Sequence, residues 1–381
     1  MTDLHFVVPD AIDDPHRPSG GNLYDRRVSA GLSALGWTVV EHRVPGPALG
    51  RGHGPGSGSG PESSREPESA SAALQRELTT IPTGSVVLLD GLIASGSPSV
   101  LVPAAARLRL VVLVHLPLGH AWSAGSAWSD GPSGDPRESR VLTAAAAVIA
   151  TSGWTRRRLL ELYPLDPARV HVAEPGVDPA PLGLGTPAGS ALLCVAAVTP
   201  DKGHDLLLAA LATVADLPWQ CTCAGALDLD PGWVEHLRHL SRRAGIADRV
   251  HFVGPLPCPD LDRAYAAADV LVHASSGETY AMVVTEALAR GLPVIATSVG
   301  GLPKALGQAS GGDRPGLLVP AGDSELFGAA VRSWLVDDGL RQELRARARA
   351  RRGTLSGWSA TTRSIAEVLD RVAHPGRAAH S

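Results

Sequence analysis

Residues 270–296 read VLVHASSGETYAMVVTEALARGLPVIA and contain a complete strand–loop–helix–strand unit. Short apolar runs predict buried strands at Val270–His273 and at 294–296. Between them, apolar residues recur with helical spacing from about Ala281, which predicts a helix as far as Arg290. A helix that links two buried strands is typical of a parallel α/β sheet.

The same alternation continues along the chain and divides it into two parts. A stretch rich in Pro and Gly at 178–190 is expected to be a flexible linker between a first domain, 1–178, and a second domain, 190–356. Residues 357–381 follow as a helix and tail. A low-complexity segment at about 45–71 cannot bury apolar surface and is expected to form a mobile loop. Two such α/β units leave a cleft between them, and ligands bind there at the carboxyl ends of the strands.

The remaining expected elements follow the same two patterns, short apolar runs for strands and helical spacing for helices. Further strands are expected at 5–8, 38–40, 85–89, 110–115, 147–151, 169–172, 191–197, 220–224, 250–253 and 316–319. Further helices are expected at 26–35, 72–78, 100–106, 155–162, 205–214, 233–244, 261–267, 324–352 and 360–372, and a loop rich in Gly and Ser at 119–139.

The composition indicates a soluble globular protein with a sizeable core. Hydrophobic residues make up 44% of the 381 residues and charged residues 19%, and the formal net charge is −4. This balance argues against a disordered chain and against a basic surface for nucleic acid. No apolar run approaches the roughly 20 residues of a membrane-spanning helix, so no integral membrane segment is expected. The first residues show no leader with a basic and an apolar part, so a cytoplasmic protein is expected.

Four cysteines in so long a chain do not make a disulfide framework. Cys221 and Cys223 share one face of a predicted strand, which favours buried thiols. A zinc site with His251 and Cys258 is conceivable, but the paired C-x-x-C spacing of such sites is absent. Core thiols are therefore the preferred interpretation, for Cys194 as well.

Two glutamates lie eight residues apart in the unit at 270–296. Glu278 follows a strand, and Glu286 lies on the helix that begins near Ala281. The free backbone amides at this helix start, those of Ala281, Met282 and Val283, favour an anion such as a diphosphate. Carboxylates beside it suit the hydroxyls of a sugar and a ribose. The alternative is a capping glutamate and a solvated one, but the apolar residues around Glu286 argue against a solvated helix face.

The stretches GETYAMVVTEALARGLPVIATSVGG, VAAVTPDKGHDLLLAAL and AYAAADVLVHAS resemble the family 4 retaining glycosyltransferases, the glycosyl transferases group 1. The resemblance is specific from about residue 147 to 369, and in the first 140 residues it is mainly one of pattern. It implies the GT-B architecture, in which two Rossmann-like domains face each other across a cleft and the C-terminal helix crosses back to the first domain. It also implies that Glu278 contacts the transferred sugar, that Glu286 contacts the nucleotide ribose, and that the amides of 281–283 hold the sugar and diphosphate.

The same resemblance assigns the neutralisation of the donor diphosphate to Lys202, in the segment TPDKG. The family commonly has an arginine five residues earlier, where this chain has Ala197. Lys202 is therefore expected to be the dominant cation at the leaving diphosphate, unless another arginine takes that place. Asp228 and Asp230 form a D-x-D pair of the kind that binds a metal in single-domain glycosyltransferases. In a two-domain enzyme no catalytic metal and no cofactor are expected.

A glycine pair, Gly20 and Gly21, follows the first predicted strand. By itself such a pair indicates a turn. Its position matches the glycines whose backbone approaches the donor phosphates in the family, and Asn22 beside it is a candidate acceptor contact.

His115 ends a predicted strand and matches a histidine that family members often place near the transferred sugar and the acceptor. His120 competes for this role. Trp122 and Trp128 follow in the Gly- and Ser-rich loop, where indoles either stack on an acceptor ring or fold into the core. His120 and Trp122 are the acceptor-side candidates of this loop.

These observations predict a metal-independent, retaining glycosyltransferase with His115, Lys202 and Glu278 as catalytic residues. The second domain would bind a UDP- or GDP-sugar, and the first a small-molecule or glycan acceptor. The acceptor hydroxyl would attack from the face that the diphosphate leaves, with the leaving phosphate as the base. The first domain shows no well-placed carboxylate, in keeping with a mechanism that needs no side-chain nucleophile. The alternatives are another GT-B enzyme, such as a nucleotide-sugar epimerase or a phosphorylase, and a non-catalytic nucleotide-sugar-binding protein.

Overall fold

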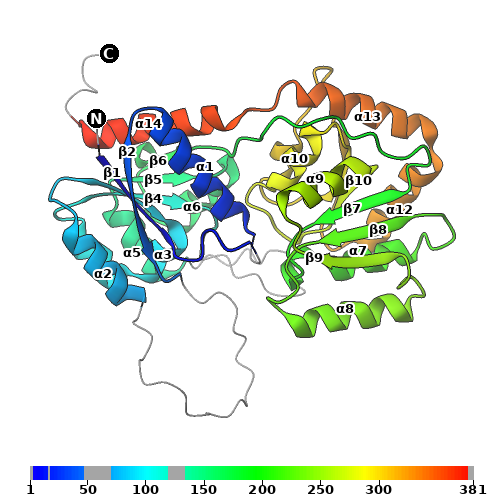
Figure 1. Ribbon diagram of the computed structural model, residues 1–381, viewed down its shortest axis with the longest axis horizontal. Helices are drawn as coiled ribbons and strands as arrows, with labels where there is room; N and C mark the ends of the chain where they lie inside the picture. Colours follow the sequence, from blue (N-terminus) through cyan, green and yellow to red (C-terminus); the bar gives the residue numbers. More distant parts are fainter. Residues whose placement is uncertain (1–2, 16–17, 47–69, 119–133, 376–381) are drawn as a thin grey trace, which may run out of the picture.

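The computed structural model describes residues 3–15, 18–46, 70–118 and 134–375. It contains two six-stranded parallel sheets flanked by helices, in two α/β domains that lie side by side (Figure 1). This is the expected fold class. Most of the expected mobile loop at 45–71 lies outside the described residues, but its last two residues already belong to a helix.

The first domain is built on a sheet with the strand order β2-β1-β3-β4-β5-β6. Its strands are β1 Asp3–Pro9, β2 Thr38–Val44, β3 Val86–Asp90, β4 Arg109–Val114, β5 Ala147–Ala150 and β6 Val170–Val172. Its helices are α1 Gly20–Ala34, α2 Ala70–Thr80, α3 Gly91–Gly96, α4 Pro98–Ala104, α5 Pro136–Ala144 and α6 Gly153–Leu162. All neighbouring strands run parallel. The first five strands have the flavodoxin-like order.

The second domain repeats the architecture with the order β12-β11-β10-β7-β8-β9, again all parallel. Its strands are β7 Ala191–Val195, β8 Gln220–Ala224, β9 Val250–Gly254, β10 Val270–His273, β11 Val294–Thr297 and β12 Gly316–Val319. Its helices are α7 His204–Ala212, α8 Pro231–Arg243, α9 Cys258–Ala267, α10 Met282–Ala289, α11 Leu302–Leu306, α12 Ser324–Val336 and α13 Asp338–Arg352. If β7 is numbered as strand 1 and the sheet is described from β9 to β12, the order is 3-2-1-4-5-6, the order of dinucleotide-binding Rossmann domains.

Each sheet has one point at which the crossovers change direction. In the first sheet this point lies between β1 and β3, and in the second between β7 and β10. Open parallel sheets bind ligands beyond the carboxyl ends of the two strands that flank such a point. At these ends, Gly20 and Gly21 begin the helix after β1, Asp90 ends β3, and Lys202 and Glu278 follow β7 and β10.

The central strands are largely apolar because both faces of each sheet are covered. Every residue of β3 and of β10 is buried. In the first sheet Val7 and Leu89 belong to the core under one layer of helices, while Phe6 and Leu88 belong to the core on the opposite face. This alternation follows from the period of two in a strand.

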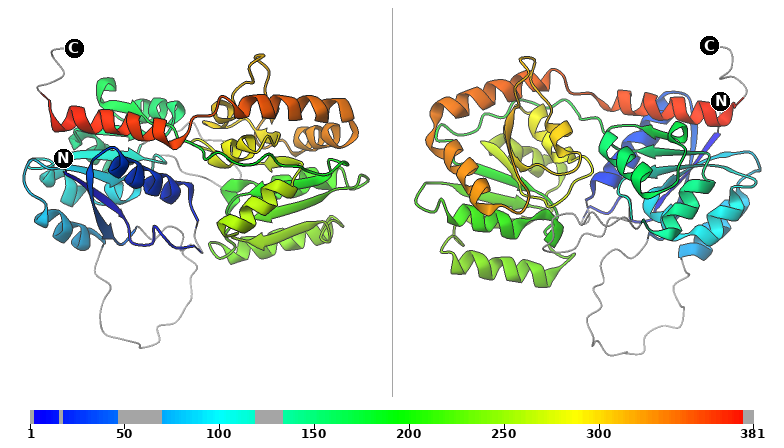
Figure 2. Two further views of the ribbon diagram at one scale, coloured as in Figure 1. Left: turned by 45° about the horizontal axis from the view of Figure 1, so that its top comes forward. Right: turned by 180° about the vertical axis from the view of Figure 1, so that it is seen from behind.

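The C-terminal helix α14, Trp358–Ala373, crosses back to the first domain, as expected (Figures 1 and 2). Its buried residues Ile365, Val368 and Leu369 join the core beneath α1. Two segments therefore link the domains, one before β7 and one before α14. They touch each other, because the Val177 amide donates to the Ser356 carbonyl at 3.0 Å.

Several helices differ from the expected ranges. Helix α1 begins six residues earlier than expected, since the Ser19 hydroxyl accepts from the Asn22 amide and caps it. Helices α3, α5 and α11 were not expected, because they are short and lack an apolar period long enough to recognise. Helix α5 occupies the end of the expected loop at 119–139, where Asp135 caps it. The helical stretch expected at 324–352 comprises the two helices α12 and α13, and Asp337 caps the second.

The segment 178–190 forms no helix or strand, but the prediction of a flexible linker is wrong. Asp269, buried at the start of β10, accepts hydrogen bonds from the amide and the hydroxyl of Thr186, both at 2.6 Å. The Gly183 amide donates to the Arg290 carbonyl at 2.8 Å. The segment is therefore packed along the second domain.

Candidate active site between the two domains

Lys202 and Glu278 meet at the switch point of the second sheet. Lys202 Nζ donates to Glu278 Oε1 at 2.8 Å, and His273 Nε2 lies 2.9 Å from the same oxygen. Asp201 lies 3.6 Å from the ammonium. The sequence indicated Lys202 and Glu278 separately; the structure brings them into one ion pair and adds His273 as a further partner. The available signal for His273 was its position as the last residue of the predicted strand, β10.

The charges of this pair stabilise each other. Burial alone would raise the pKa of Glu278, but Lys202 and His273 outweigh burial and hold this pKa well below its usual range. Burial alone would lower the pKa of Lys202, but Glu278 and Asp201 raise it. Both groups are therefore ionised at neutral pH. Their side chains are 25% and 12% exposed, so the pair lies at the surface of the site rather than deep in the core.

Two loops fix the position of this pair. The hydroxyls of Ser275 and Ser276 donate to the Asp201 carbonyl, at 3.1 and 3.0 Å, and thereby tie the β10 loop to the turn that carries Lys202. The Gly301 amide donates to the Glu278 carbonyl at 2.8 Å. Gly300 packs so closely that a Cβ there would lie 1.8 Å from the same carbonyl oxygen. The backbone of Glu278 is thus clamped between two loops.

Helix α10 begins directly after this loop at Met282, one residue later than the sequence indicated. Its N-cap Ala281 has a φ of 69°, the one positive φ of a non-glycine residue in the described parts of the chain, and its side chain provides no cap. The amides of Met282 and Val283 thus start a helix that no side chain caps, a favourable place for an anion. Strained backbone of this kind is common at functional sites.

Glu286 lies one turn into α10 and has partners of its own. The Tyr265 hydroxyl donates to Glu286 Oε2 at 2.9 Å, and Arg290 stacks 4.5 Å over the tyrosine ring. Burial raises the pKa of Glu286, and the Tyr265 hydrogen bond opposes that rise. The structure therefore does not join Glu286 to the Lys202–Glu278 pair. No motif in the sequence pointed to Tyr265, whose side chain comes from another helix, α9.

The glycine pair of the first domain forms the first turn of α1 and faces the second domain. A Cβ on Gly20 would lie 3.4 Å from Met282 Sδ, so the N-termini of α1 and α10 approach each other across the domain boundary. A Cβ on Gly21 would lie 3.4 Å from the ring of His115. The amide of Asn22 is used by the Ser19 cap. The two helix starts thus face each other with His115 beside them.

His115 directly follows β4 and meets two carboxylates. Its Nε2 lies 2.9 Å from Asp25 Oδ1 and 3.8 Å from Asp90 Oδ2. Both aspartates are buried. The expectation that the first domain lacks a well-placed carboxylate is therefore wrong. Asp25 on α1 and Asp90 at the end of β3 are far apart in sequence. The one available signal was that Asp90 and His115 lie at the ends of adjacent strands.

Three aromatic or histidine candidates, His120, Trp122 and Trp128, lie outside the described residues, and their expected roles stay predictions.

The residues that the sequence offered as metal ligands, the D-x-D pair and His251 with Cys258, do not form a metal site in the structure. Asp230 caps α8 through the Trp233 amide at 2.9 Å, a structural use of one member of the D-x-D pair. Cys258 is exposed, and His251 lies 2.8 Å from Gln220, so the conceivable zinc site with these residues does not form. The thiols at 194, 221 and 223 are buried, as expected.

Two groups of potential ligands do occur in the described parts of the chain. They are Asp25, Asp90 and His115, and Cys194, His204 and Cys223.

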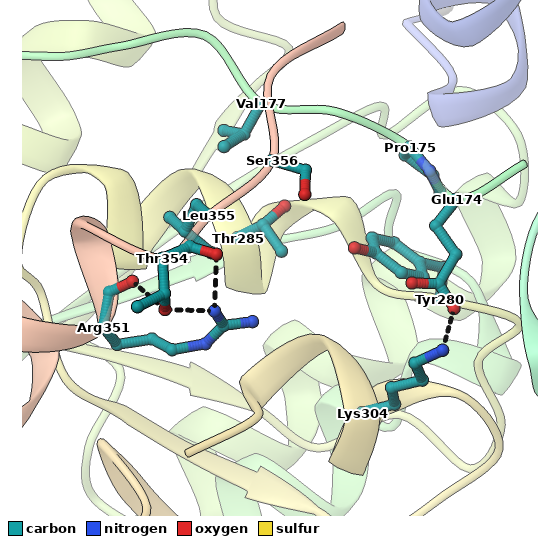
Figure 3. Close-up of a pocket in the computed structure, with 10 residues that line it drawn as sticks. All are labelled: Glu174, Pro175, Val177, Tyr280, Thr285, Lys304, Arg351, Thr354, Leu355 and Ser356. Atoms are coloured by element: carbon teal, nitrogen blue, oxygen red, sulfur yellow. Dashed lines mark hydrogen bonds and ion pairs between the residues drawn. The ribbon is translucent and has the colours of Figure 1, made fainter. Parts of the chain in front are cut away.

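A small pocket of about 110 Å³ lies beside α10, where the two linking segments pass (Figure 3). Its lining residues are Glu174, Pro175, Val177, Tyr280, Thr285, Lys304, Arg351, Thr354, Leu355 and Ser356. Lys304 forms an ion pair with Glu174 and so joins the second domain to the first. Of the predicted site residues that the structure describes, none lines this pocket, which belongs to the connection between the domains.

Comparisons with known proteins agree with this architecture. A model described as glycosyl transferases group 1 matches residues 189–351, and one described as glycosyltransferase family 4 matches residues 27–181. The D-inositol 3-phosphate glycosyltransferase of Kineococcus radiotolerans is 35% identical over 289 residues, which are 68% of this chain and 66% of that protein. D-inositol 3-phosphate glycosyltransferase 1 of Catenulispora acidiphila is 31% identical over 307 residues, 74% of this chain and 71% of that protein.

Solved structures with the same fold cover nearly the whole chain. The sucrose-phosphate synthase of Thermosynechococcus elongatus superposes with a TM-score of 0.75 at 21% identity, over 98% of this chain and 99% of that one. Alr3699/HepE of Anabaena in complex with UDP-glucose gives 0.70 at 18% identity, over 97% and 100%. These neighbours define a GT-B fold, and with the family matches they place the chain among the family 4 glycosyltransferases, to which it belongs.

The chain spans about two thirds of the length of the D-inositol 3-phosphate glycosyltransferases that it matches. The aligned part is 66% of the Kineococcus radiotolerans protein and 63% and 65% of two further relatives. Among the helices of the described residues, none has both the length and the apolar character needed to cross a membrane.

Proposed function

We propose that this chain is a retaining glycosyltransferase that moves a sugar from a nucleotide-diphosphate sugar to an acceptor hydroxyl without a metal. The observation that carries the proposal is the Lys202–Glu278 pair beside the uncapped start of α10. A cation, a carboxylate and free amides in one place match the diphosphate and the hydroxyls of a donor sugar. The domain arrangement then leaves the first domain for the acceptor.

In the proposed complex, the amides of Met282 and Val283 hold the diphosphate and Lys202 neutralises it. Glu278 accepts hydrogen bonds from the transferred sugar, and Glu286 accepts them from the ribose. Position 197, where the family commonly has an arginine, is an alanine here and supplies no positive charge to the diphosphate. His273, at the ion pair and with its Nδ1 buried and unpartnered, is a second hydrogen-bonding group at the site. A negative charge grows on the departing diphosphate, and Lys202 stabilises this charge most where it is largest, in the transition state.

The proposed chemistry is a same-face substitution. The bond between the anomeric carbon and the diphosphate oxygen breaks, and its electron pair stays on the diphosphate. The acceptor oxygen forms the new bond from the same face, and its proton passes to the leaving phosphate. Anomeric configuration is thereby retained.

A uridine donor is the first candidate, because UDP-glucose and UDP occupy the Alr3699/HepE structures. The names of the relatives favour a cyclitol or related polyol as the acceptor. Free thiols throughout the chain support the proposal of a cytoplasmic enzyme, since such a compartment keeps cysteines reduced.

The test is nucleotide release from UDP-, GDP- and ADP-sugars, with and without inositol and inositol phosphate, together with the melting temperature in each free nucleotide. We expect the release of the nucleotide to depend on the presence of an acceptor. We also expect a new glycoside that keeps the anomeric configuration of the donor sugar. The family membership does not favour an epimerase, a phosphorylase or a pure binding protein. An epimerised sugar nucleotide, release that requires inorganic phosphate, or binding without turnover would each identify one of them and contradict the proposal.

Metal independence has its own test. Dialysis against EDTA is expected to leave the rate of nucleotide release unchanged. A loss that Mg²⁺ or Mn²⁺ restores would contradict metal independence and direct attention to the Asp25, Asp90 and His115 group.

A further inference from the structure

Asp25 and Asp90 form an ionisable cluster with His115, and the family resemblance accounted only for the histidine. The three residues come from α1, from the end of β3 and from the end of β4, and one ligand atom of each lies within 4.8 Å of the others. The cluster sits at the switch point of the first sheet, under the first turn of α1. It belongs to the first-domain side of the proposed active site, and the role inferred for it rests on the proposed function.

The two ring nitrogens of His115 have different surroundings. Nε2 lies 2.9 Å from Asp25 Oδ1. Nδ1 has no hydrogen-bond partner among the described residues, and the His115 side chain is 16% exposed. The ring is held between Gly21 and Tyr24, whose ring it meets edge-on at 5.2 Å. The geometry therefore leaves one nitrogen for the protein and one for a ligand.

A carboxylate can only accept hydrogen bonds, so the nitrogen that faces Asp25 must carry the hydrogen. This holds for the charged ring and for the neutral ring alike. In the neutral ring Nδ1 is then an acceptor, and in the charged ring it is a donor. Either way Asp25 decides which nitrogen the substrate meets.

We propose that Asp25, with Asp90 behind it, is a positioning residue that commits Nε2–H of His115 to the protein and presents Nδ1 to a hydroxyl of the bound substrate. The hydroxyl belongs either to the transferred sugar or to the acceptor, and the test separates the two. Asp90 acts at longer range, because its Oδ1 already caps α3 through the amides of Leu92 and Ile93, at 2.9 and 3.2 Å.

Charge supports this arrangement. Asp25 Oδ2 is buried without a hydrogen-bond partner, so the ring is the main compensation for that carboxylate. Burial lowers the pKa of His115, but Asp25 and then Asp90 raise it above its ordinary value. Burial and the Asp25 charge raise the pKa of Asp90 to about 6. Among the described residues, the titratable groups that face the ring from the elements packed on it are Tyr24 and Asp25 of α1 and Asp90 of the β3–α3 junction.

The first measurement is the titration of His115 by NMR in protein labelled with ¹⁵N-histidine. His115→Gln identifies its signals among those of the 14 histidines. We expect Nε2 to carry the hydrogen above the pKa, and we expect the pKa to fall by about one unit or more in Asp25→Asn, because a neighbouring carboxylate is lost. Asp90→Asn should shift it in the same direction by less, and it keeps the helix cap because Asn caps as well as Asp. Asp216→Asn, which breaks an exposed ion pair with Arg332, is the matched control and should change nothing.

The second measurement is the pH profile of nucleotide release from UDP-glucose. The inflection that belongs to His115 should move to lower pH in Asp25→Asn, and Asp25→Glu should restore part of the rate. If the hydroxyl belongs to the sugar, slow hydrolysis of UDP-glucose without acceptor changes too. If it belongs to the acceptor, only transfer to inositol changes, chiefly in KM for the acceptor.

An unshifted His115 titration in both asparagine variants would overturn the proposal, as would a hydrogen on Nδ1 in the neutral ring. A signal that changes with EDTA or Mn²⁺ would overturn it too, because the cluster would then be a metal site. Should Asp25→Asn fail to fold, Asp90→Asn alone decides the matter by the same criteria. Absence of turnover with every donor would contradict the proposed function, while the NMR titration would still test the role of Asp25.

Discussion

Lys202 is one of two lysines in the chain, and the other offers a matched control. We expect Lys202→Met to lower kcat at saturating donor by at least about a hundredfold, roughly 2.7 kcal/mol at 1.36 kcal/mol per decade, because the departing diphosphate loses its main cation. Lys304→Met removes the ion pair with Glu174 instead and should leave kcat within about a factor of three. Initial rates with saturating UDP-glucose measure both. A Lys202→Met enzyme with normal kcat would show that another cation serves the diphosphate.

Substitutions of Glu286 and Glu278 should have different effects, because the proposed partner of Glu286 is the ribose and that of Glu278 is the transferred sugar. Glu286→Ala should weaken the affinity for free UDP by about 1.5–3 kcal/mol, since the ribose hydroxyls lose a charged acceptor. Glu278→Ala should leave UDP affinity unchanged and lower turnover of UDP-glucose, because its proposed partner is the sugar. Tyr265→Phe keeps the Glu286 carboxylate but removes its 2.9 Å hydrogen bond, so its effect on UDP affinity should be smaller. Calorimetric titration with UDP measures all three, and equal affinities for UDP in Glu286→Ala and wild type would remove the ribose assignment.

At the scale of elements, the loop before α11 holds the loop before α10. Gly300 has a φ of +53°, and a Cβ there would meet the Glu278 carbonyl at 1.8 Å. Gly300→Ala should therefore displace Glu278 and lower both the melting temperature and kcat. Gly322 has a φ of +78° with nothing within 4 Å of the Cβ position, so Gly322→Ala carries the same backbone penalty of about 1 kcal/mol without the clash. Equal melting temperatures and rates in the two variants would show that the contact does not position Glu278.

At the scale of the whole molecule, the last helix completes the core of the first domain. Ile365 is fully buried, so Ile365→Ala should lower the free energy of unfolding by about 2–5 kcal/mol. Val336→Ala, at a position that is 58% exposed at the end of α12, should cost less than about 0.5 kcal/mol. Urea unfolding followed by far-UV circular dichroism, which reports on both domains, measures the effect of each variant. An unchanged transition in Ile365→Ala would mean that the first domain is stable without α14.

The strands and their parallel arrangement were predictable because a fully buried strand leaves an apolar run in the sequence itself. The Lys202 and Glu278 positions were predictable from motifs that place them after β7 and β10. The Asp25–His115–Asp90 cluster was not, because its members are brought together by three crossovers and no local period connects them. Asp25 lies within one helix of polar and apolar residues, and nothing in its neighbours indicates that its side chain turns inward toward β4. The same holds for Tyr265 and Glu286, which belong to different helices.

The hydrogen bond between Val177 and Ser356 has a mechanical consequence. The chain passes between the domains twice, and the two passages touch each other. They therefore act together as a single hinge between the domains. Twisting one domain against the other about the long axis of the molecule would pull the two passages apart. Bending the domains about an axis that runs through both passages would leave the passages in contact. Opening and closing for substrate entry and product release should therefore follow one angular coordinate.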